Sequence, residues 1–206
     1  DAIWAQLRLS SKSHWDVPVD TPLGRLHVLA SHPTPPVFDG PEKRNAARNH
    51  DEIRLWAEYL NGGQPSWLFD DQGRAGGLAT EAAFVLLGDQ NADPTDGSSI
   101  DYAIRQLLQH PRVLPYPAPR STQGRLAAQR AGGANLSHQG DADEDTGNFG
   151  PRSGNLRVDY VLPSRQFEVV NSGIFWPAPG ETGADWIEVS DHRLVWLDLQ
   201  PAATGR

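Results

Sequence analysis

Short apolar runs separated by polar turns predict several β-strands in the first half of the chain. Apolar and polar residues alternate from Ile3 to Leu9, and a second apolar run, Arg25 to Ala30, follows a Thr-Pro-Leu-Gly turn. Alternation with a period of two is typical of a strand with one buried face. The apolar run from Ala82 to Leu87 is continuous and ends at Gly88, so it predicts a strand that is covered on both faces.

Two segments repeat their apolar residues with the period of a helix. Between residues 46 and 60 the apolar positions follow the spacing i, i+3, i+4, i+7, and a Gly-Gly pair ends the pattern. A second helix is predicted over residues 100–109, with Ser98 or Ser99 as its N-cap. The residues of this helix that are expected to face the core are Ala103, Ile104, Leu107 and Leu108.

The region from residue 121 to residue 155 differs in composition from the rest of the chain. Gly, Ala, Asn, Asp and Ser dominate it, so we expect a long Gly/Asp-rich surface loop within the domain. Strand-like stretches follow at residues 156–162, 167–176 and 193–199. Strands outnumber helices, and their connections mix hairpins with helical crossovers. We therefore expect an α+β fold, a layered α/β sandwich of two packed mixed or antiparallel sheets flanked by helices, and not a doubly wound parallel sheet.

The composition indicates one acidic globular domain. The chain has 206 residues, 38% of them apolar, and 26 acidic against 18 basic residues leave a net charge of −8. The Lys and Arg residues are scattered, which disfavours long duplex DNA as a partner. The absence of Cys excludes disulfides and cysteine nucleophiles and leaves His, Asp, Glu and Asn for catalysis. No apolar run reaches the length of a membrane span, and the first residues do not resemble a signal peptide.

Four polar clusters stand next to predicted strands, where side chains of neighbouring strands can meet at one end of a sheet. Each cluster has a structural alternative when taken alone: Ser31-His32 can be an exposed turn, Gly88-Asp89-Gln90-Asn91 a tight turn, Asp159 half of an ion pair, and Ser190-Asp191-His192 an Asx turn. Together they supply two His, three Asp and one Asn. This set matches what metal-assisted hydrolysis of a phosphate ester requires, with Mg²⁺, Mn²⁺ or Ca²⁺ as the hard cation that oxygen ligands prefer.

The order of these clusters resembles that of a known superfamily. His32, Gly88-Asp89-x-Asn91, Asp159-Tyr-Val and Ser190-Asp191-His192 are similar to motifs of the endonuclease/exonuclease/phosphatase superfamily, which includes pancreatic deoxyribonuclease, abasic-site endonucleases, sphingomyelinases and inositol-polyphosphate phosphatases. Residues 9–19, 30–41 and 88–94 look like uncharacterised bacterial members, many of them apparently exported. The resemblance therefore implies an extracellular or periplasmic protein.

The resemblance also implies a role for each motif residue. Asp89 would orient or activate the attacking water, and Asn91 would contact the scissile phosphate. Asp191, with Asp89 and Asn91, would hold the metal. His32 would donate to a phosphoryl oxygen, and Asp159 would hydrogen-bond His192 and support its charged form beside the phosphate.

Two residues that precede His32 are further candidates for substrate contact. Lys12 falls on the strand before the His32 strand, where relatives carry a basic phosphate contact, and His14 follows it. A solvated Lys at a sheet edge and a structural His are the alternatives for these two positions.

One part of the family pattern has no counterpart here. Relatives carry an Asn on a first strand and a metal-binding Glu, both well upstream of the His segment. We therefore expect residues 1–206 to be the C-terminal part of one catalytic domain, with an incomplete first sheet and the N-terminal segment of the same protein as a missing partner. The predicted function is metal-dependent hydrolysis of phosphate esters, with nuclease and phosphatase both open and nucleic acid kept as a possible substrate. The alternatives are a non-catalytic binding module and an inactive fragment.

Overall fold

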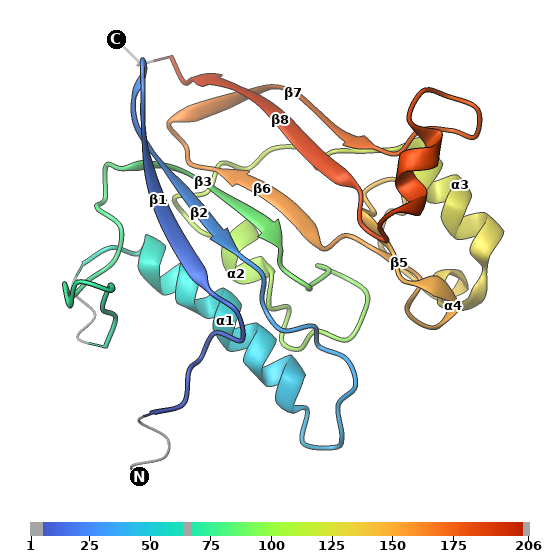
Figure 1. Ribbon diagram of the computed structural model, residues 1–206, viewed down its shortest axis with the longest axis horizontal. Helices are drawn as coiled ribbons and strands as arrows, with labels where there is room; N and C mark the ends of the chain where they lie inside the picture. The colour runs from blue at the N-terminus through green and yellow to red at the C-terminus, as the bar shows by residue number, and fades with distance from the viewer. Residues whose placement is uncertain (1–5, 64–66, 204–206) are drawn as a thin grey trace.

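The computed structural model describes residues 6–63 and 67–203, and these residues form strands and helices in an α+β arrangement (Figure 1). The strands are β1 (His14–Thr21), β2 (Gly24–Ser31), β3 (Ala83–Asp89), β4 (Gly147–Asn148), β5 (Asn155–Leu156), β6 (Asp159–Pro163), β7 (Phe167–Phe175) and β8 (Leu194–Pro201). The helices are α1 (Arg44–Leu60), α2 (Arg105–Leu108), α3 (Thr122–Ala131) and α4 (Gly150–Ser153), with 3₁₀ turns η2 (Gly133–Leu136) and η3 (Ala184–Glu188). The predicted fold class is confirmed.

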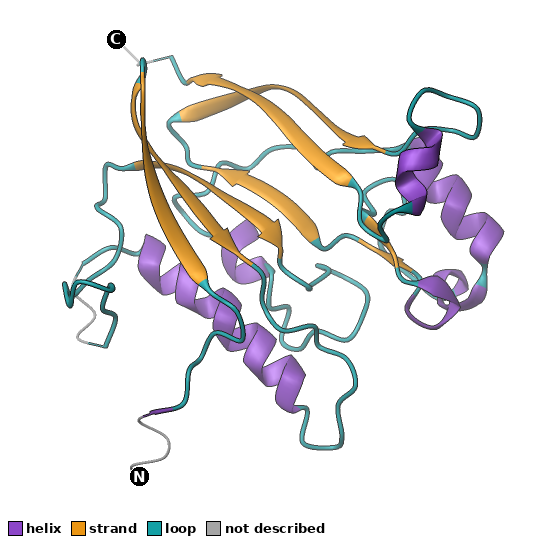
Figure 2. Ribbon diagram, viewed as in Figure 1, coloured by secondary structure: helices purple, strands orange, loops and turns teal. Residues whose placement is uncertain are grey.

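The main sheet has four strands in the order β1-β2-β3-β6, and two small antiparallel sheets, β4-β5 and β7-β8, complete the arrangement (Figure 2). The β1-β2 and β3-β6 pairs are antiparallel and the β2-β3 pair is parallel. A doubly wound parallel sheet is therefore excluded, as predicted. Among the described helices, none combines the length and apolar character that crossing a membrane needs.

Helix α1 lies against one face of the main sheet and closes the hydrophobic core. Its predicted apolar stripe is buried, with Ile53 and Leu60 at 0% exposure and Trp56 at 2%. The stripe packs in one cluster with Leu29 of β2 and Leu86 of β3, which are paired neighbours in the sheet. We call this side the helix-backed face.

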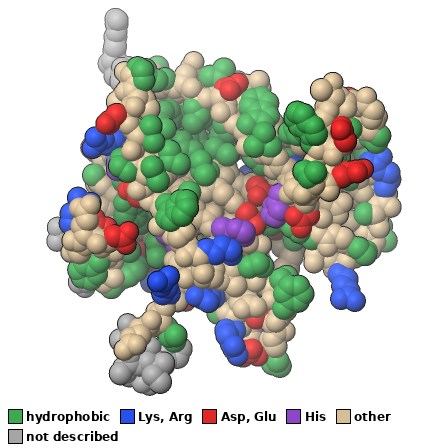
Figure 3. All heavy atoms as spheres, viewed as in Figure 1, with side chains coloured by type: hydrophobic (Ala, Val, Ile, Leu, Met, Phe, Trp, Pro, Cys, Tyr) green, Lys and Arg blue, Asp and Glu red, His purple; other side chains and the backbone are tan. Residues whose placement is uncertain are grey.

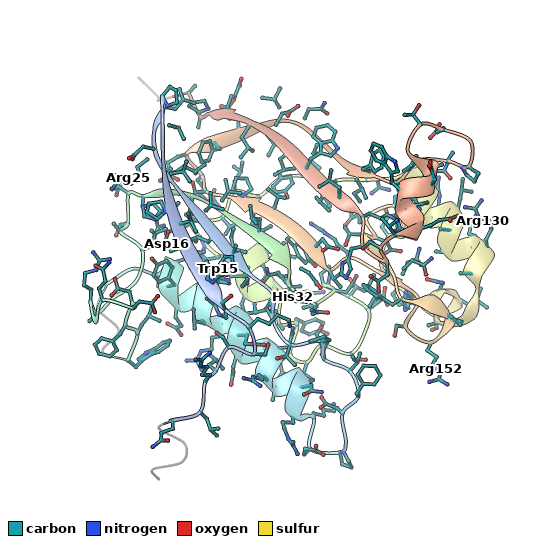
Figure 4. The ribbon with its side chains drawn as sticks, viewed as in Figure 1. Trp15, Asp16, Arg25, His32, Arg130 and Arg152 are labelled. Carbon is teal, nitrogen blue, oxygen red and sulfur yellow. The ribbon has the colours of Figure 1, made fainter. Side chains whose placement is uncertain are left out.

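The opposite side of the main sheet, here called the open face, is also apolar. Strand register places these residues on it: Trp15, Val17 and Val19 of β1, Leu26, Val28 and Ala30 of β2, Val85 and Leu87 of β3, and Val161 of β6. The β1 residues are exposed, Trp15 by 60% and Val17 by 46%. Apolar side chains gather over β1, β2 and the space between these strands and β8 (Figure 3), and Trp15 lies on β1 (Figure 4). The same register puts Asp89 and Asp159 at the end of the open face.

The predicted first strand, over residues 3–9, is wrong in the part that the structure describes. Residues 3–5 of the predicted first strand lie outside the described residues, and residues 6–9 form no strand. The side chain of Arg48 instead binds the carbonyl oxygens of Arg8 and Leu9. Lys12 accordingly precedes β1 and does not lie on a strand.

The predicted helix over residues 100–109 is reduced to the single turn of α2. Asp101 and Tyr102 have φ angles of 49° and 51°, which no α-helix tolerates, so neither Ser98 nor Ser99 caps a helix. The inward residues Ala103, Ile104 and Leu107 are nevertheless fully buried. The apolar spacing predicted burial correctly but not the backbone conformation.

The predicted surface loop over residues 121–155 is largely ordered structure, which corrects that prediction. Ser121 accepts a hydrogen bond from the Gln123 amide and so caps α3. The Arg120 guanidinium binds Asp141 and Asp143 at 2.7 and 2.9 Å, which balances part of the acidic cluster. Short elements with few apolar residues escape detection by periodicity.

Candidate functional site

Polar side chains from distant parts of the chain meet at the end of the open face. A cavity of about 820 Å³ is lined by His32, Asp89, Asn91, Asp191 and His192, among others. His32 directly follows β2 (Figure 4). Acidic and histidine side chains meet near the middle of the molecular face in Figure 3. The sixth central residue, Asp159, is the strand partner of Asp89. The structure thus brings the six together, while their roles stay predictions.

The turn after β3 fixes the position of Asp89. Gly88 has a φ of 127°, and a Cβ at this position would lie 2.2 Å from the carbonyl oxygen of Ser31, so only glycine fits. Asp89 Oδ1 accepts the amide N–H of Asn91 at 2.7 Å, and Asn91 takes a left-handed φ of 50° that Asn tolerates well. The Asn91 side chain donates to the carbonyl oxygen of Pro33, which ties this turn to the His32 loop.

Two imidazoles flank the free oxygen of Asp89. The Nε2 atoms of His32 and His192 lie 3.3 and 3.7 Å from Asp89 Oδ2. Burial, reinforced by the nearby charge of Asp159, raises the pKa of Asp89 to about 6. A carboxylate with this pKa is ionised at neutral pH and remains basic enough to accept a proton.

His192 is held by a carboxylate on its other side. Its Nδ1–H donates to Asp159 Oδ2 at 3.0 Å, and the Thr146 hydroxyl donates to the same oxygen at 2.8 Å. The hydrogen bond to Asp159 is the main reason that the pKa of His192 rises to about 9. Burial, together with the charges of Lys12 and His192, lowers the pKa of His32. At neutral pH the site therefore contains one cationic and one neutral imidazole.

The two predicted substrate contacts before β1 differ in position. Lys12 is exposed, and its positive charge lowers the pKa of both His32 and Asp89. Lys12 therefore lies near the site. His14 is outside the cavity lining: its Nδ1 meets the Ser10 hydroxyl at 2.5 Å, its Nε2 meets the Glu52 carbonyl oxygen at 2.9 Å, and its ring packs on Trp56. Both ring nitrogens are thus engaged within the chain, and a substrate contact of His14 stays an unsupported prediction.

The donor set fits a hard divalent cation. Within the described residues, ligand atoms of Asp89, Asp159 and His192 lie within 4.8 Å of one another. Asp159 and His192 already bond each other, which leaves the Asp89 carboxylate as the free member of this group. Asp191 and Asn91 add two further oxygen donors to the same cavity. Carboxylate and amide oxygens are the ligands that Mg²⁺, Mn²⁺ and Ca²⁺ prefer.

The structure adds residues that the sequence patterns did not single out. Thr146, 2% exposed, holds Asp159 through its hydroxyl and accepts the amide N–H groups of Val158 and Asp159. The ring of Phe149 meets the His192 ring edge to face at 5.3 Å and lines the cavity. Both residues lie in the region that was predicted to be a loop, where spacing carries no signal.

A buried carboxylate on α1 supports the loops on either side of the site. Glu52, 1% exposed, accepts the backbone amides of Ser11 and Thr34, which flank Lys12 and His32 in the sequence. Helical spacing placed neighbouring residues of α1 in the core, but it could not indicate this polar contact.

A carboxylate between two imidazoles, one of them held by a second carboxylate, is an arrangement that metal-assisted hydrolysis of a phosphate ester can use. Residues 3–192 match the Endonuclease/Exonuclease/phosphatase family, and the chain belongs to this family. This confirms the resemblance seen in the motifs. Metal-dependent hydrolysis of phosphate esters is the chemistry that family membership implies.

Several solved structures are similar in fold. The chain aligns with an endonuclease/exonuclease/phosphatase from Beutenbergia cavernae at 19% identity and a TM-score of 0.48, over 90% of this chain and 38% of the other. It aligns with sphingomyelinase C from Streptomyces griseocarneus at 13% identity and a TM-score of 0.43, over 89% of this chain and 52% of the other. It also aligns with a beta toxin variant from Staphylococcus aureus with bound magnesium ions, at 9% identity and a TM-score of 0.41, over 88% of this chain and 52% of the other. The chain thus spans from 38% to about half of their lengths, and no curated protein sequence matches it.

Proposed function

We propose that this chain carries the water-activating part of a divalent-metal-dependent hydrolase of phosphate esters. One observation carries the proposal: the imidazoles of His32 and His192 lie within 3.3 and 3.7 Å of Asp89 Oδ2, in a cavity that a phosphate group can enter. Family membership supports the same class of reaction.

Asp89 is the group that we assign to the attacking water. In the proposed step the water oxygen forms a bond to phosphorus, and one water proton passes to the Asp89 carboxylate. The bond between phosphorus and the leaving oxygen breaks, and this oxygen takes a proton from solvent. The products are an alcohol and a phosphate with one ester bond fewer.

The two histidines and Asn91 are assigned to the phosphate. His192, kept cationic by Asp159, stabilises the negative charge that develops on a phosphoryl oxygen. His32 is neutral and donates a hydrogen bond to another oxygen. Asn91 is held by the turn after β3 and presents its side chain to the same cavity.

A metal completes the proposed site. Bound Mg²⁺, Mn²⁺ or Ca²⁺ supplies positive charge that stabilises the phosphoryl oxygens. Asp89, Asn91 and Asp191 are the residues that would hold it, because Asp159 and His192 are already bonded to each other. Such a cation prefers about six oxygen ligands. We therefore propose that three protein ligands alone bind it weakly.

We further propose that another segment of the same protein covers the open face and contributes to the site. Exposure of Trp15, Val17 and Val19 on one sheet face supports this, since an apolar sheet face is normally packed against a second layer. The complete enzyme, with this segment, is the form in which we expect full activity.

Phosphoester hydrolysis by the full-length protein tests the proposal. The substrates are bis(p-nitrophenyl) phosphate, p-nitrophenyl phosphate and plasmid DNA, each with Mg²⁺, Mn²⁺ or Ca²⁺ and with a chelator. Asp89→Asn and His192→Ala are each expected to lower kcat by roughly two orders of magnitude or more with the fold intact by circular dichroism.

The matched control is Asp20→Asn, which changes an exposed carboxylate whose partner is Arg25 at the β1-β2 turn. It is expected to leave turnover unchanged. Near-normal turnover in Asp89→Asn, or loss of activity only through unfolding, would contradict the assignment. No turnover of any substrate by the parent protein would favour a non-catalytic binding module.

A further inference from the structure

The side chain of Phe38 lies at the cavity and does not pack against the core. Its side chain lines the cavity and is 100% exposed, so its apolar surface is not buried on folding. Its φ of 59° lies in the left-handed region, where a side chain with a large ring is disfavoured. Strained backbone of this kind clusters at active sites, ligand-binding loops and switch regions.

The backbone on both sides of Phe38 is anchored to α1. The Asn45 side chain donates to the carbonyl oxygen of Val37 at 2.8 Å. The Asp39 carboxylate accepts the amide N–H groups of Asn45 and Ala46, each at 2.8 Å, and thereby caps the helix from outside it. The backbone that carries Phe38 is thus tied to α1, so little additional ordering of this backbone is needed when a ligand binds.

The residues just before Phe38 give the cavity an apolar wall, the rest of the lining mixes apolar with polar side chains, and the lining carries little positive charge. Pro35, Val37, Phe149 and Leu156 contribute apolar surface to its walls. Among the described lining residues, Arg152 is the one Lys or Arg side chain, and four Asp side chains line the same cavity. Binding of a polynucleotide depends on several Lys and Arg contacts to successive phosphates. The walls instead match a ligand with a single phosphate and an uncharged organic group.

We propose that Phe38 contacts substrate, packing its ring against the apolar organic group of a small phosphate ester that carries one phosphate. This inference rests on the proposed function and names the substrate class of that site. Phe38 contributes to binding of the organic group, whereas the catalytic residues contact the phosphate.

Binding of two non-hydrolysable ligands to the full-length protein in the presence of Mg²⁺ tests the inference by calorimetry. Phenylphosphonate and methylphosphonate share the phosphorus group and differ in the organic group. Phe38→Ala and Phe38→Gly are expected to weaken phenylphosphonate binding by about five- to tenfold, the worth of one aromatic contact, with methylphosphonate binding unchanged. Phe38→Tyr is expected to keep the parent's preference.

Phe38→Gly gives a second readout, because glycine adopts the left-handed φ without strain. Its Tm is expected to equal or exceed that of the parent while phenylphosphonate binding falls, and a residue with a structural role would lose stability instead. Leu23→Ala is the matched control, since Leu23 is 75% exposed at the β1-β2 turn. It is expected to change neither ligand's affinity.

The outcomes separate this inference from the proposed function. Loss of the phenyl preference in Phe38→Ala supports the inference even if the parent protein hydrolyses no ester. Equal affinities in parent and Phe38→Ala overturn it even if hydrolysis is observed, as does failure of phenylphosphonate to bind the parent. Two further outcomes would overturn it. One is that Phe38→Ala weakens binding only of esters embedded in phosphatidylcholine vesicles. The other is that a single-stranded oligonucleotide binds more tightly than phenylphosphonate, with a steep dependence on salt.

Discussion

The two faces of the main sheet are built from similar apolar residues, yet they differ in what covers them. On the helix-backed face, Leu29 and Leu86 are fully buried against α1. On the open face, Val85 of β3 is also buried, at 8% exposure, whereas Val17 and Val19 of the edge strand β1 are exposed by 46% and 41%. The difference between the two faces is therefore largest at the edge strand β1, whose apolar side chains form an accessible surface.

The helix-backed face contributes mainly to stability, and the open face leads to the candidate site. The helix-backed face contributes hydrophobic free energy of folding, because its side chains leave water completely. The open face contributes less, but its end carries Asp89 and Asp159 and leads directly to the cavity. Substitutions on the two faces should therefore affect different properties.

The largest expected difference is in the free energy of unfolding. Leu86→Ala removes a fully buried side chain and leaves a cavity, so we expect a loss of about 3 to 4 kcal/mol. Val17→Ala, on the open face, is expected to cost less than about 1 kcal/mol. Urea denaturation followed by tryptophan fluorescence measures both, and equal losses would show that the open face is covered in solution.

A buried carboxylate in the cluster between α3 and β4 should make stability depend on pH. Asp145 is 8% exposed, and burial together with the charge of Asp93 raises its pKa to about 8. Because the folded pKa exceeds the unfolded value near 4, folding favours the protonated form. The stability present below pH 4 is lost as the pH rises toward 8.

Asp145→Asn should remove this dependence. We expect the variant to exceed the parent in unfolding free energy by about 2 kcal/mol or more at pH 9, and to match it more closely near pH 4. Urea denaturation at several pH values checks this, with exposed Asp20→Asn as the control. Parallel pH profiles of parent and Asp145→Asn would contradict the assignment.

The next effect concerns the end of the open face. Thr146→Val removes the hydroxyl that donates to Asp159, and the expected result is a fall in kcat of about tenfold as His192 loses its fixed orientation. Thr146→Ser keeps the hydroxyl and should restore most of the turnover. A merely structural Thr146 would lower stability in both variants and leave the kcat of the folded fraction unchanged.

The smallest effect on stability is expected at the most exposed part of the open face. We expect the exposed apolar residues of the open face to cause self-association at high concentration. Trp15→Ser should reduce this association and change the unfolding free energy of this chain by less than about 1 kcal/mol. Sedimentation velocity measures the association. Trp67→Ser, at a tryptophan of similar exposure outside the open face, is the control and should leave association unchanged.

Much of the main sheet and α1 could be predicted from the sequence. The apolar runs that became β2 and β3 and the 3.6-residue stripe of α1 are local patterns that reflect burial of one face or both. Strand β1 was not predicted. The predictions for residues 6–9 and 100–109 were wrong, because Arg48 binds the first segment and left-handed residues interrupt the second. Hydrophobic spacing predicts neither the contact of Arg48 with the first segment nor the left-handed φ angles in the second.

The candidate site shows the same division. The sequence by itself determined which residue types follow which strands, and the order of the motifs indicated the family. Only the tertiary structure decided that Asp89 and Asp159 are strand partners, that Thr146 holds the Asp159–His192 pair, and that Phe38 faces the same cavity. Asp89 and Asp159 are 70 positions apart in the sequence, and Thr146 and Phe38 lie in segments without a periodic pattern. They depend on strand register and long-range packing, which local propensities do not specify.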